Sequence, residues 1–183
     1  MRMFLIVLGV VLLGASMASA NGLGVYGSYW DTKDADSGFG GGAKLSMSFG
    51  QYFAVEARGT YFNDLSKDEG PLNVDLQVIP VEAGLVLNMP LSDAVTPYIG
   101  GGGGYYFLKA DTDAGSVDID DEVGWYAIAG LEIKLSDAVA LFAEGKYTGV
   151  EGTAKNDNVD NIVDKVDIDL SGFGGNAGLL LKW

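Results

Sequence analysis

The sequence 172-GFGGNAGLLLKW-183, which ends the chain, repeats its residue character with a period of two. One face of this segment carries Phe173, Gly175, Ala177, Leu179, Leu181 and Trp183. The other face carries Gly172, Gly174, Asn176, Gly178, Leu180 and Lys182. Because alternate side chains of an extended chain point to opposite sides, one apolar face at this period predicts a β-strand.

Seven earlier segments show the same period, each about 10 residues or longer. The eight predicted strands cover residues 22–30, 38–49, 53–62, 74–89, 95–108, 123–135, 139–150 and 166–183. This length and alternation are typical of strands that cross an outer membrane. We therefore predict an all-β fold, an eight-stranded antiparallel up-and-down transmembrane β-barrel.

The connections between these segments alternate in length. The short connections are 50–52, 90–94 and 136–138, and the longer, polar ones are 31–37, 63–73, 109–122 and 151–165. Such barrels have short periplasmic turns and long extracellular loops. The sequence thus predicts that both termini of the barrel are periplasmic.

The first twenty residues have the composition of a secretory signal peptide. Arg2 supplies a positive charge, residues 3–13 are apolar, and Ala18, Ser19 and Ala20 form a small-residue cleavage site. We expect cleavage after Ala20, which divides the chain into a signal peptide (1–20) and a barrel domain (21–183). The apolar run is shorter than the roughly 20 residues of a spanning helix, so only a closed barrel could place the mature chain in a bilayer.

Aromatic residues on the apolar faces form two rows. The row near the loops is Tyr29, Phe39, Tyr61, Tyr105, Phe107, Trp125, Tyr147 and Phe173, and the row near the turns is Phe49, Phe53 and Trp183. Ten tilted strand residues rise about 25 Å, the height of the apolar band of an outer-membrane barrel. The rows favour a barrel with lipid outside. The alternative is a water-soluble, lipocalin-like barrel with its apolar residues inside.

Charged residues lie on the opposite faces of the strands, which places them in the lumen. The predicted lumen network is Lys44, Glu56, Arg58, Glu82, Glu132, Glu144 and Lys146, with Lys134 and Lys182 near the rim. Unpaired buried charges are costly, so mixed signs predict internal ion pairs. A gate for a small conductance is the alternative role. Inward rings are also expected at Tyr26, Trp30, Phe62, Tyr98, Tyr106, Tyr126 and Phe142, packed against glycine or around an apolar ligand.

The loops are strongly acidic, with 19 acidic and five basic residues outside the membrane portions of the strands. This charge disfavours nucleic acid and favours cations or basic partners. Asp111, Asp113 and Glu122 occupy positions 1, 3 and 12 of a calcium-loop pattern, but Ser116 stands where the pattern requires glycine. They are a weak metal candidate only.

The chain contains no Cys and no His. Disulfides and thiolate metal sites are therefore impossible, and most hydrolytic triads and common zinc sites are excluded. We expect neither an enzyme nor a cofactor.

Two segments change the phase of their apolar residues. In the fourth segment the change falls at Pro80, which predicts a bulge because proline cannot donate to a ladder. In the eighth it falls between Leu170 and Phe173. We expect these strands to project beyond the membrane before the change.

Three stretches resemble the strands of a known family. They are 96-TPYIGGGGGYY-106, 124-GWYAIAGLE-132 and 142-FAEGKYT-148. Together with the terminal aromatic strand, they resemble small outer-membrane barrels of the opacity-protein, OmpX and OmpA-barrel type. In that family the terminal strand is also the assembly signal, with Trp183 here in place of the more usual Phe.

This resemblance implies a monomer in the bacterial outer membrane, in contact with membrane lipids, lipopolysaccharide and the barrel-assembly machinery. It implies a non-catalytic barrel with a structural or adhesin-like surface role through its acidic extracellular loops, and a basic or host-surface partner. The alternative is a narrow pore or a conduit for small hydrophobic ligands. Outer-membrane enzymes of known families depend on a His, which this chain lacks.

Overall fold

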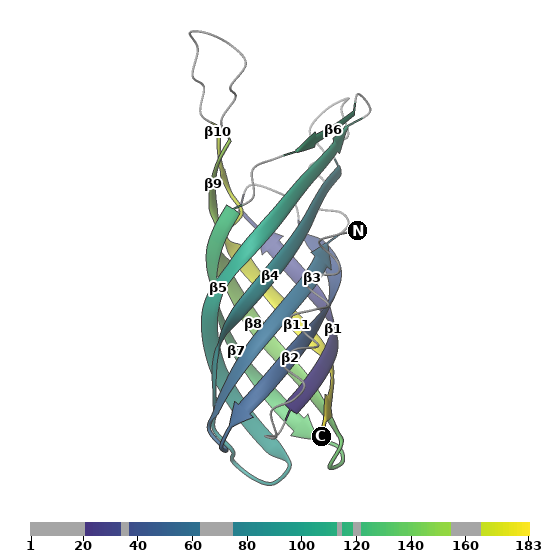
Figure 1. Ribbon diagram of the computed structural model, residues 1–183, viewed down its shortest axis with the longest axis vertical. Coiled ribbons are helices and arrows are strands. Elements are labelled where there is room, and N and C mark those ends of the chain that lie inside the picture. Colours follow the sequence, from purple (N-terminus) through teal and green to yellow (C-terminus); the bar gives the residue numbers. More distant parts are fainter. Residues whose placement is uncertain (1–20, 34–36, 63–74, 113–114, 119–121, 155–165) are drawn as a thin grey trace.

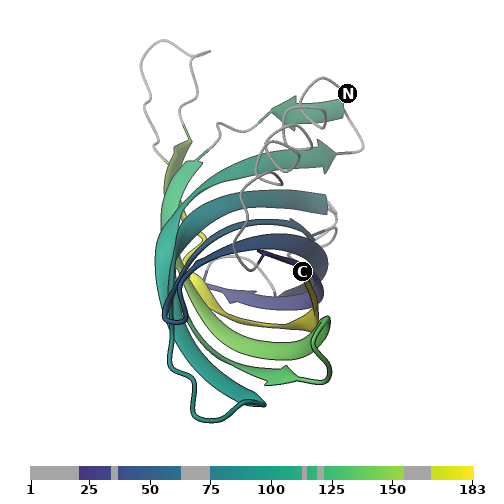
Figure 2. The same cartoon turned by 60° about the horizontal axis from the view of Figure 1, so that its bottom comes forward.

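The computed structural model describes residues 21–33, 37–62, 75–112, 115–118, 122–154 and 166–183. Its eight barrel strands wind around a common axis (Figures 1 and 2). They are β1 (Asn21–Thr32), β2 (Gly38–Phe49), β3 (Phe53–Phe62), β4 (Asp75–Asn88), β5 (Val95–Thr112), β7 (Glu122–Lys134), β8 (Val139–Gly149) and β11 (Gly172–Lys182). Within the described residues, no helix is long and apolar enough to cross a membrane.

The strands pair antiparallel with their neighbours along the chain, in the order β4-β3-β2-β1-β11-β8-β7-β5. A further pairing of β4 with β5 closes the sheet on itself. The predicted eight-stranded up-and-down barrel is therefore confirmed. Closure satisfies the backbone groups that would otherwise form exposed sheet edges.

The two ends of the barrel differ in their connections. We call the end with the β2–β3, β4–β5 and β7–β8 turns the turn end, and the opposite end the loop end. Gly50 has φ 74° in the β2–β3 turn, a backbone conformation that favours glycine. Gly22 of β1 pairs with Lys182 of β11, so both ends of the barrel domain lie at the turn end.

Two strand pairs extend beyond the barrel at the loop end (Figure 1). β5 continues to Thr112 and pairs with β6 (Gly115–Asp118), while β9 (Glu151–Ala154) pairs with β10 (Val166–Asp169). The prediction that 109–122 and 151–165 are loops throughout is thus wrong. The β9–β10 pair keeps the register of the β8–β11 ladder, because Thr148 pairs with Gly172 and Glu151 with Asp169.

The inner and outer faces of the barrel carry opposite kinds of side chain. Lys44, Arg58 and Glu82 are 3%, 3% and 2% exposed on the inside. By contrast, Phe39 and Phe173 are 79% and 72% exposed on the outside. This arrangement rules out the lipocalin-like alternative, which requires an apolar interior and a charged exterior.

The register of the strands does not shift where the apolar residues change phase. β3 and β4 keep one register from the Phe53–Leu87 pair to the Phe62–Val78 pair, and β4 pairs with β5 without interruption through Pro80. The predicted bulge at Pro80 is therefore wrong.

The apolar residues that suggested the phase changes point into the lumen. Val78 and Leu170 are buried in a cluster at the loop end, which consists of Trp30, Phe62, Val78, Tyr106, Val150 and Leu170. We call this cluster the apolar cap. At this end Asp31 is exposed on the outer face. The strands therefore keep their alternation, but at the loop end the inner face is apolar and the outer face is polar.

Candidate functional site

The middle of the lumen holds a cluster of four charged side chains from three strands. Arg58 of β3 donates hydrogen bonds of 2.5 Å to Glu56 and to Glu144 of β8. Lys44 of β2 lies 3.2 Å from the Glu56 carboxylate and 3.8 Å from that of Glu144. We call these four residues the central cluster. Its two cations and two anions balance, which limits the cost of burying them.

Neutral groups complete the hydrogen bonding of Glu144. The Tyr98 hydroxyl donates to this carboxylate at 2.8 Å, and the Asn176 amide donates at 2.7 Å. The Lys44 ammonium also lies 3.8 Å from the centre of the Phe142 ring, a cation–π contact.

A second charged group lies nearer the loop end. Lys146 donates to both carboxylate oxygens of Glu82 at 2.6 Å, and the Tyr106 hydroxyl donates to Glu82 at 2.6 Å. The Tyr126 ring lies 5.2 Å from the Arg58 guanidinium carbon and 5.3 Å from the Lys146 nitrogen. Tyr126 thereby contacts cations of both groups.

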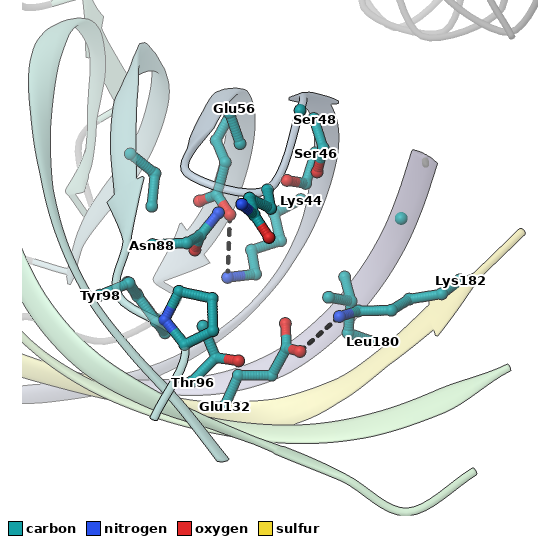
Figure 3. A pocket seen from close by; sticks show the side chains of 16 residues that line it. Lys44, Ser46, Ser48, Glu56, Asn88, Thr96, Tyr98, Glu132, Leu180 and Lys182 are labelled. Atoms are coloured by element: carbon teal, nitrogen blue, oxygen red, sulfur yellow. Dashed lines mark hydrogen bonds and ion pairs between the residues drawn. The ribbon is translucent and has the colours of Figure 1, made fainter. Parts of the chain in front are cut away.

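A third charged pair lies apart from the others, near the turn end. Glu132 of β7 is paired with Lys182 of β11 (Figure 3). Both side chains are part-exposed and line a cavity that also reaches Lys44. The seven residues predicted as one network are therefore divided among three groups.

Lys134 lies at the turn-end rim, opposite the buried Ala140 of β8. It is exposed at the end of β7, where its ammonium lies 2.6 Å from the Asp137 carboxylate in the following turn. The hydrogen bond and the positive charge of Lys134 lower the pKa of Asp137.

Large side chains occupy much of the remaining lumen. Tyr126 is 2% exposed, and Tyr106 and Val78 of the apolar cap are completely buried. All seven predicted inward rings are buried. Close contacts with glycine accompany them: a Cβ atom added at Gly42 would lie 2.6 Å from the Tyr26 ring. Large buried side chains therefore occupy much of the described lumen on the loop-end side of the turn-end cavity.

The weak calcium candidate does not form a calcium loop in the described residues. Asp111 lies in β5, paired with Ser116 of β6, and Glu122 begins β7 opposite Tyr106. Such extended pairs replace the compact loop that the pattern requires. Asp113 lies outside the described residues. Among those that are described, no group of three or more Asp or Glu residues could hold a metal ion.

Two other predicted residues lie at the chain ends. Trp183 follows β11 at the turn end and is 61% exposed on the outer face. Ala20 and the predicted signal peptide lie outside the described residues.

Three neutral side chains, Tyr98, Tyr106 and Asn176, were not predicted to donate to the charged groups. Each lies on the inner face, where alternation alone places it. Their hydroxyl and amide groups were a usable signal, because a buried carboxylate needs several donors. Their specific partners lie 24 to 46 residues away along the chain and depend on register.

Solved structures of outer-membrane barrels are similar to this chain. The outer membrane protein OprG from Pseudomonas aeruginosa has a TM-score of 0.73 at 17% identity, covering 91% of this chain and 96% of that one. Neisserial surface protein A has a TM-score of 0.66 at 13% identity, covering 90% and 96%. Ail, the attachment invasion locus protein of Yersinia pestis, has a TM-score of 0.55 at 15% identity, covering 90% of this chain and 97% of that one.

At these identities the structural likeness shows the fold alone. No curated protein matches the sequence at a significant level. A family model does match: the outer membrane protein beta-barrel domain covers residues 4–179, nearly the whole chain. Together with the closed barrel, its charged interior and its apolar exterior, this match assigns the protein to the bacterial outer membrane. The chain belongs to the outer membrane protein beta-barrel domain family.

Proposed function

We propose that this protein is a non-catalytic barrel that acts as a surface-interaction protein through its acidic loop end. The observation that carries the proposal is the pairing of acidic residues beyond the barrel. Glu151 lies opposite Asp169 in the β9–β10 pair, and Asp75 lies opposite Asp111 in the β4–β5 pair. Like charges at directly opposed positions destabilise a sheet, so stability alone gives no reason for them.

A basic partner would offset the negative charge that this register brings together. The surrounding loop sequences add to the negative charge, with 19 acidic against five basic residues outside the membrane portions. One similar structure is of Ail in complex with a heparin analogue, sucrose octasulfate. A polyanion of that kind would be repelled by this chain. The partner class that we propose is therefore a basic protein surface or peptide, including one on a host cell.

The test is binding of a lysine-rich peptide to the protein folded in lipid nanodiscs. Replacing the opposed pair (Glu151→Gln with Asp169→Asn) should weaken binding several-fold, because two attractive charges are lost. The matched control removes the same charge at the turn end (Asp93→Asn with Asp137→Asn) and should leave binding unchanged. Equal losses in both variants would reduce the effect to net charge and contradict a loop-end site.

We also propose that the loop end faces the exterior and the turn end faces the periplasm. The chain has no Cys, so single cysteines can report orientation without background. In whole cells, an impermeant thiol reagent should label Asn158→Cys, which lies between β9 and β10 in the sequence, and not Asp93→Cys in the β4–β5 turn. Labelling of Asp93→Cys alone would reverse the orientation.

The remaining partners follow from residence in the membrane. We propose that the protein is a monomer that contacts lipids and lipopolysaccharide, and that the assembly machinery reads the strand ending at Trp183. Removing Trp183 should lower the folded fraction in the outer membrane of intact cells. Folding in detergent should be nearly unaffected, since only recognition is lost.

The alternative is a narrow pore or a conduit for small hydrophobic ligands. The large buried side chains of the lumen and the apolar cap argue against continuous conduction. Planar-bilayer recording should therefore show no steady unitary current. If steady steps appear and change on Glu82→Gln substitution, the conduit explanation is correct and the surface role loses its main support.

A further inference from the structure

A cavity of about 210 Å³ occupies the lumen at the turn end (Figure 3). Its wall comes from β1, β2, β3, β4, β5, β7 and β11, and it ends inward at Lys44, Glu56 and Tyr98. Gln51 of the β2–β3 turn and Pro90 of the β4–β5 turn also line it. One water molecule needs only about 10–15 Å³ of such space, so the cavity has room for a compact small molecule.

The charges in the wall are already compensated within the protein. Lys44 is held by Glu56 at 3.2 Å, and Lys182 is paired with Glu132. An anion or a cation entering the cavity would lose hydration without finding an unpaired counter-charge. The cavity therefore selects against charged ligands.

Neutral polar groups face the same space. Ser46 and Ser48 come from β2, Asn88 from β4 and Thr96 from β5 (Figure 3). Among the described residues, no hydrogen bond joins these four side chains to a protein partner. Hydroxyl and amide groups both donate and accept, so they suit a ligand with several hydroxyls.

Apolar side chains line the cavity beside these polar groups. Ala54, Val86 and Leu180 contribute aliphatic surface, and the ring of Tyr98 adds an aromatic one. A ligand with hydroxyl edges and C–H faces matches both parts of this wall. Water alone would gain nothing from the apolar part.

We propose that the turn-end cavity binds one small, uncharged polyhydroxy molecule of the monosaccharide class. The ligand enters and leaves by the turn end, because the central cluster closes the cavity on its inner side. Its hydroxyls bond to Ser46, Asn88 and Thr96, and its apolar face lies against Val86 and Leu180. This site is independent of the acidic loop end.

The experiment is an NMR titration of the isotope-labelled, full-length barrel in nanodiscs with three sugars of nearly equal size. Neutral glucose should shift the resonances of Ser46, Asn88 and Thr96. Cationic glucosamine and anionic gluconate should shift them at least several-fold less at equal concentration. Equal shifts for all three, or none with glucose, would overturn the proposal.

Variants locate the site. Asn88→Leu should abolish the glucose-dependent shifts at Ser46 and Thr96, whereas Ser28→Ala, in the lumen wall near the loop end, should preserve them. If Asn88→Leu fails to fold, Ser46→Ala is the second variant and should weaken the shifts. Shifts that survive both cavity variants would place glucose elsewhere and reject the site. Because no loop residue is changed, failure here leaves the peptide-binding test of the acidic loop end untouched.

Discussion

At the centre of the lumen, Arg58 donates to two carboxylates that lie on different strands, Glu56 of β3 and Glu144 of β8. The guanidinium therefore bridges the barrel from one wall toward another. Its planar group can donate in several directions at once, which a lysine in the same place could not match. Buried ion pairs of this kind add little net stability when complete, yet the loss of one partner is costly.

Arg58→Met should consequently lower the free energy of unfolding by about 3–5 kcal/mol, because one buried carboxylate loses its cation. Adding Glu144→Gln should restore part of this loss, since the remaining charges balance again. Urea unfolding in detergent micelles or lipid vesicles measures both. Lys134→Met is the control on an exposed ion pair and should change little. An additive double variant would show that the two residues are not coupled.

Gly42 and Gly41 allow a matched test of packing in adjacent positions. A Cβ atom at Gly42 would lie 2.6 Å from both the Tyr26 ring and the Gly59 carbonyl oxygen, whereas one at Gly41 meets nothing nearer than 3.8 Å. Gly42→Ala should therefore destabilise the barrel by about 1–3 kcal/mol, the usual cost of overpacking. Gly41→Ala should be nearly neutral in the same unfolding assay. Equal effects would contradict the inward orientation of Gly42.

At the scale of the strands, alternation was enough to predict all eight barrel segments and their faces. The sequence could not distinguish a loop from a strand that continues above the membrane, because both are polar there. β6 and β9 were therefore missed, and β10 was predicted only as the first part of the eighth strand. The apolar residues Val78 and Leu170 were also misread as signs of a bulge or a break. A period of two separates the two faces of a strand, but it does not say which face meets water above the membrane.

Leu170→Ala tests the interpretation of these residues as part of the apolar cap. Leu170 is 3% exposed and lies among the large side chains of that cluster. Its truncation leaves a cavity and should lower the free energy of unfolding by about 2–5 kcal/mol. Leu91→Ala, at a 76% exposed position in the β4–β5 turn, is the control and should have little effect. A neutral Leu170→Ala variant would remove the cap as a stabilising element.

For the whole molecule, the three tryptophans report which face meets lipid. Trp30 is buried in the lumen, whereas Trp125 and Trp183 are 55% and 61% exposed on the outer face. In single-tryptophan variants, brominated lipids should quench the fluorescence of Trp125 and Trp183 and leave that of Trp30 nearly unchanged. Stronger quenching of Trp30 would show that the faces are assigned the wrong way round.

The architecture of the molecule was thus readable from local pattern, while the candidate sites were not. Alternation along the strands predicted that Glu82 and Glu132 face the lumen. The strand register decides their partners: Glu82 pairs with Lys146 and Glu132 with Lys182. Which pairs form depends on the tilt and stagger of strands far apart in sequence. The turn-end cavity has no local signature, since its wall is assembled from seven strands.

On β1 the outer face changes from an aromatic side chain at Tyr29 to a charged one at Asp31. This change marks the height at which the lipid-facing part of the wall ends. On the turn-end side of this height the outer face is apolar and suits lipid. On the loop-end side the outer face is polar and the inner face apolar, as in a water-soluble protein. The loop-end part of the barrel should therefore tolerate grafted hairpins that were designed for aqueous solution, provided that each graft supplies its own buried apolar side chains. A change made in this part of the barrel can then be chosen without reference to the bilayer.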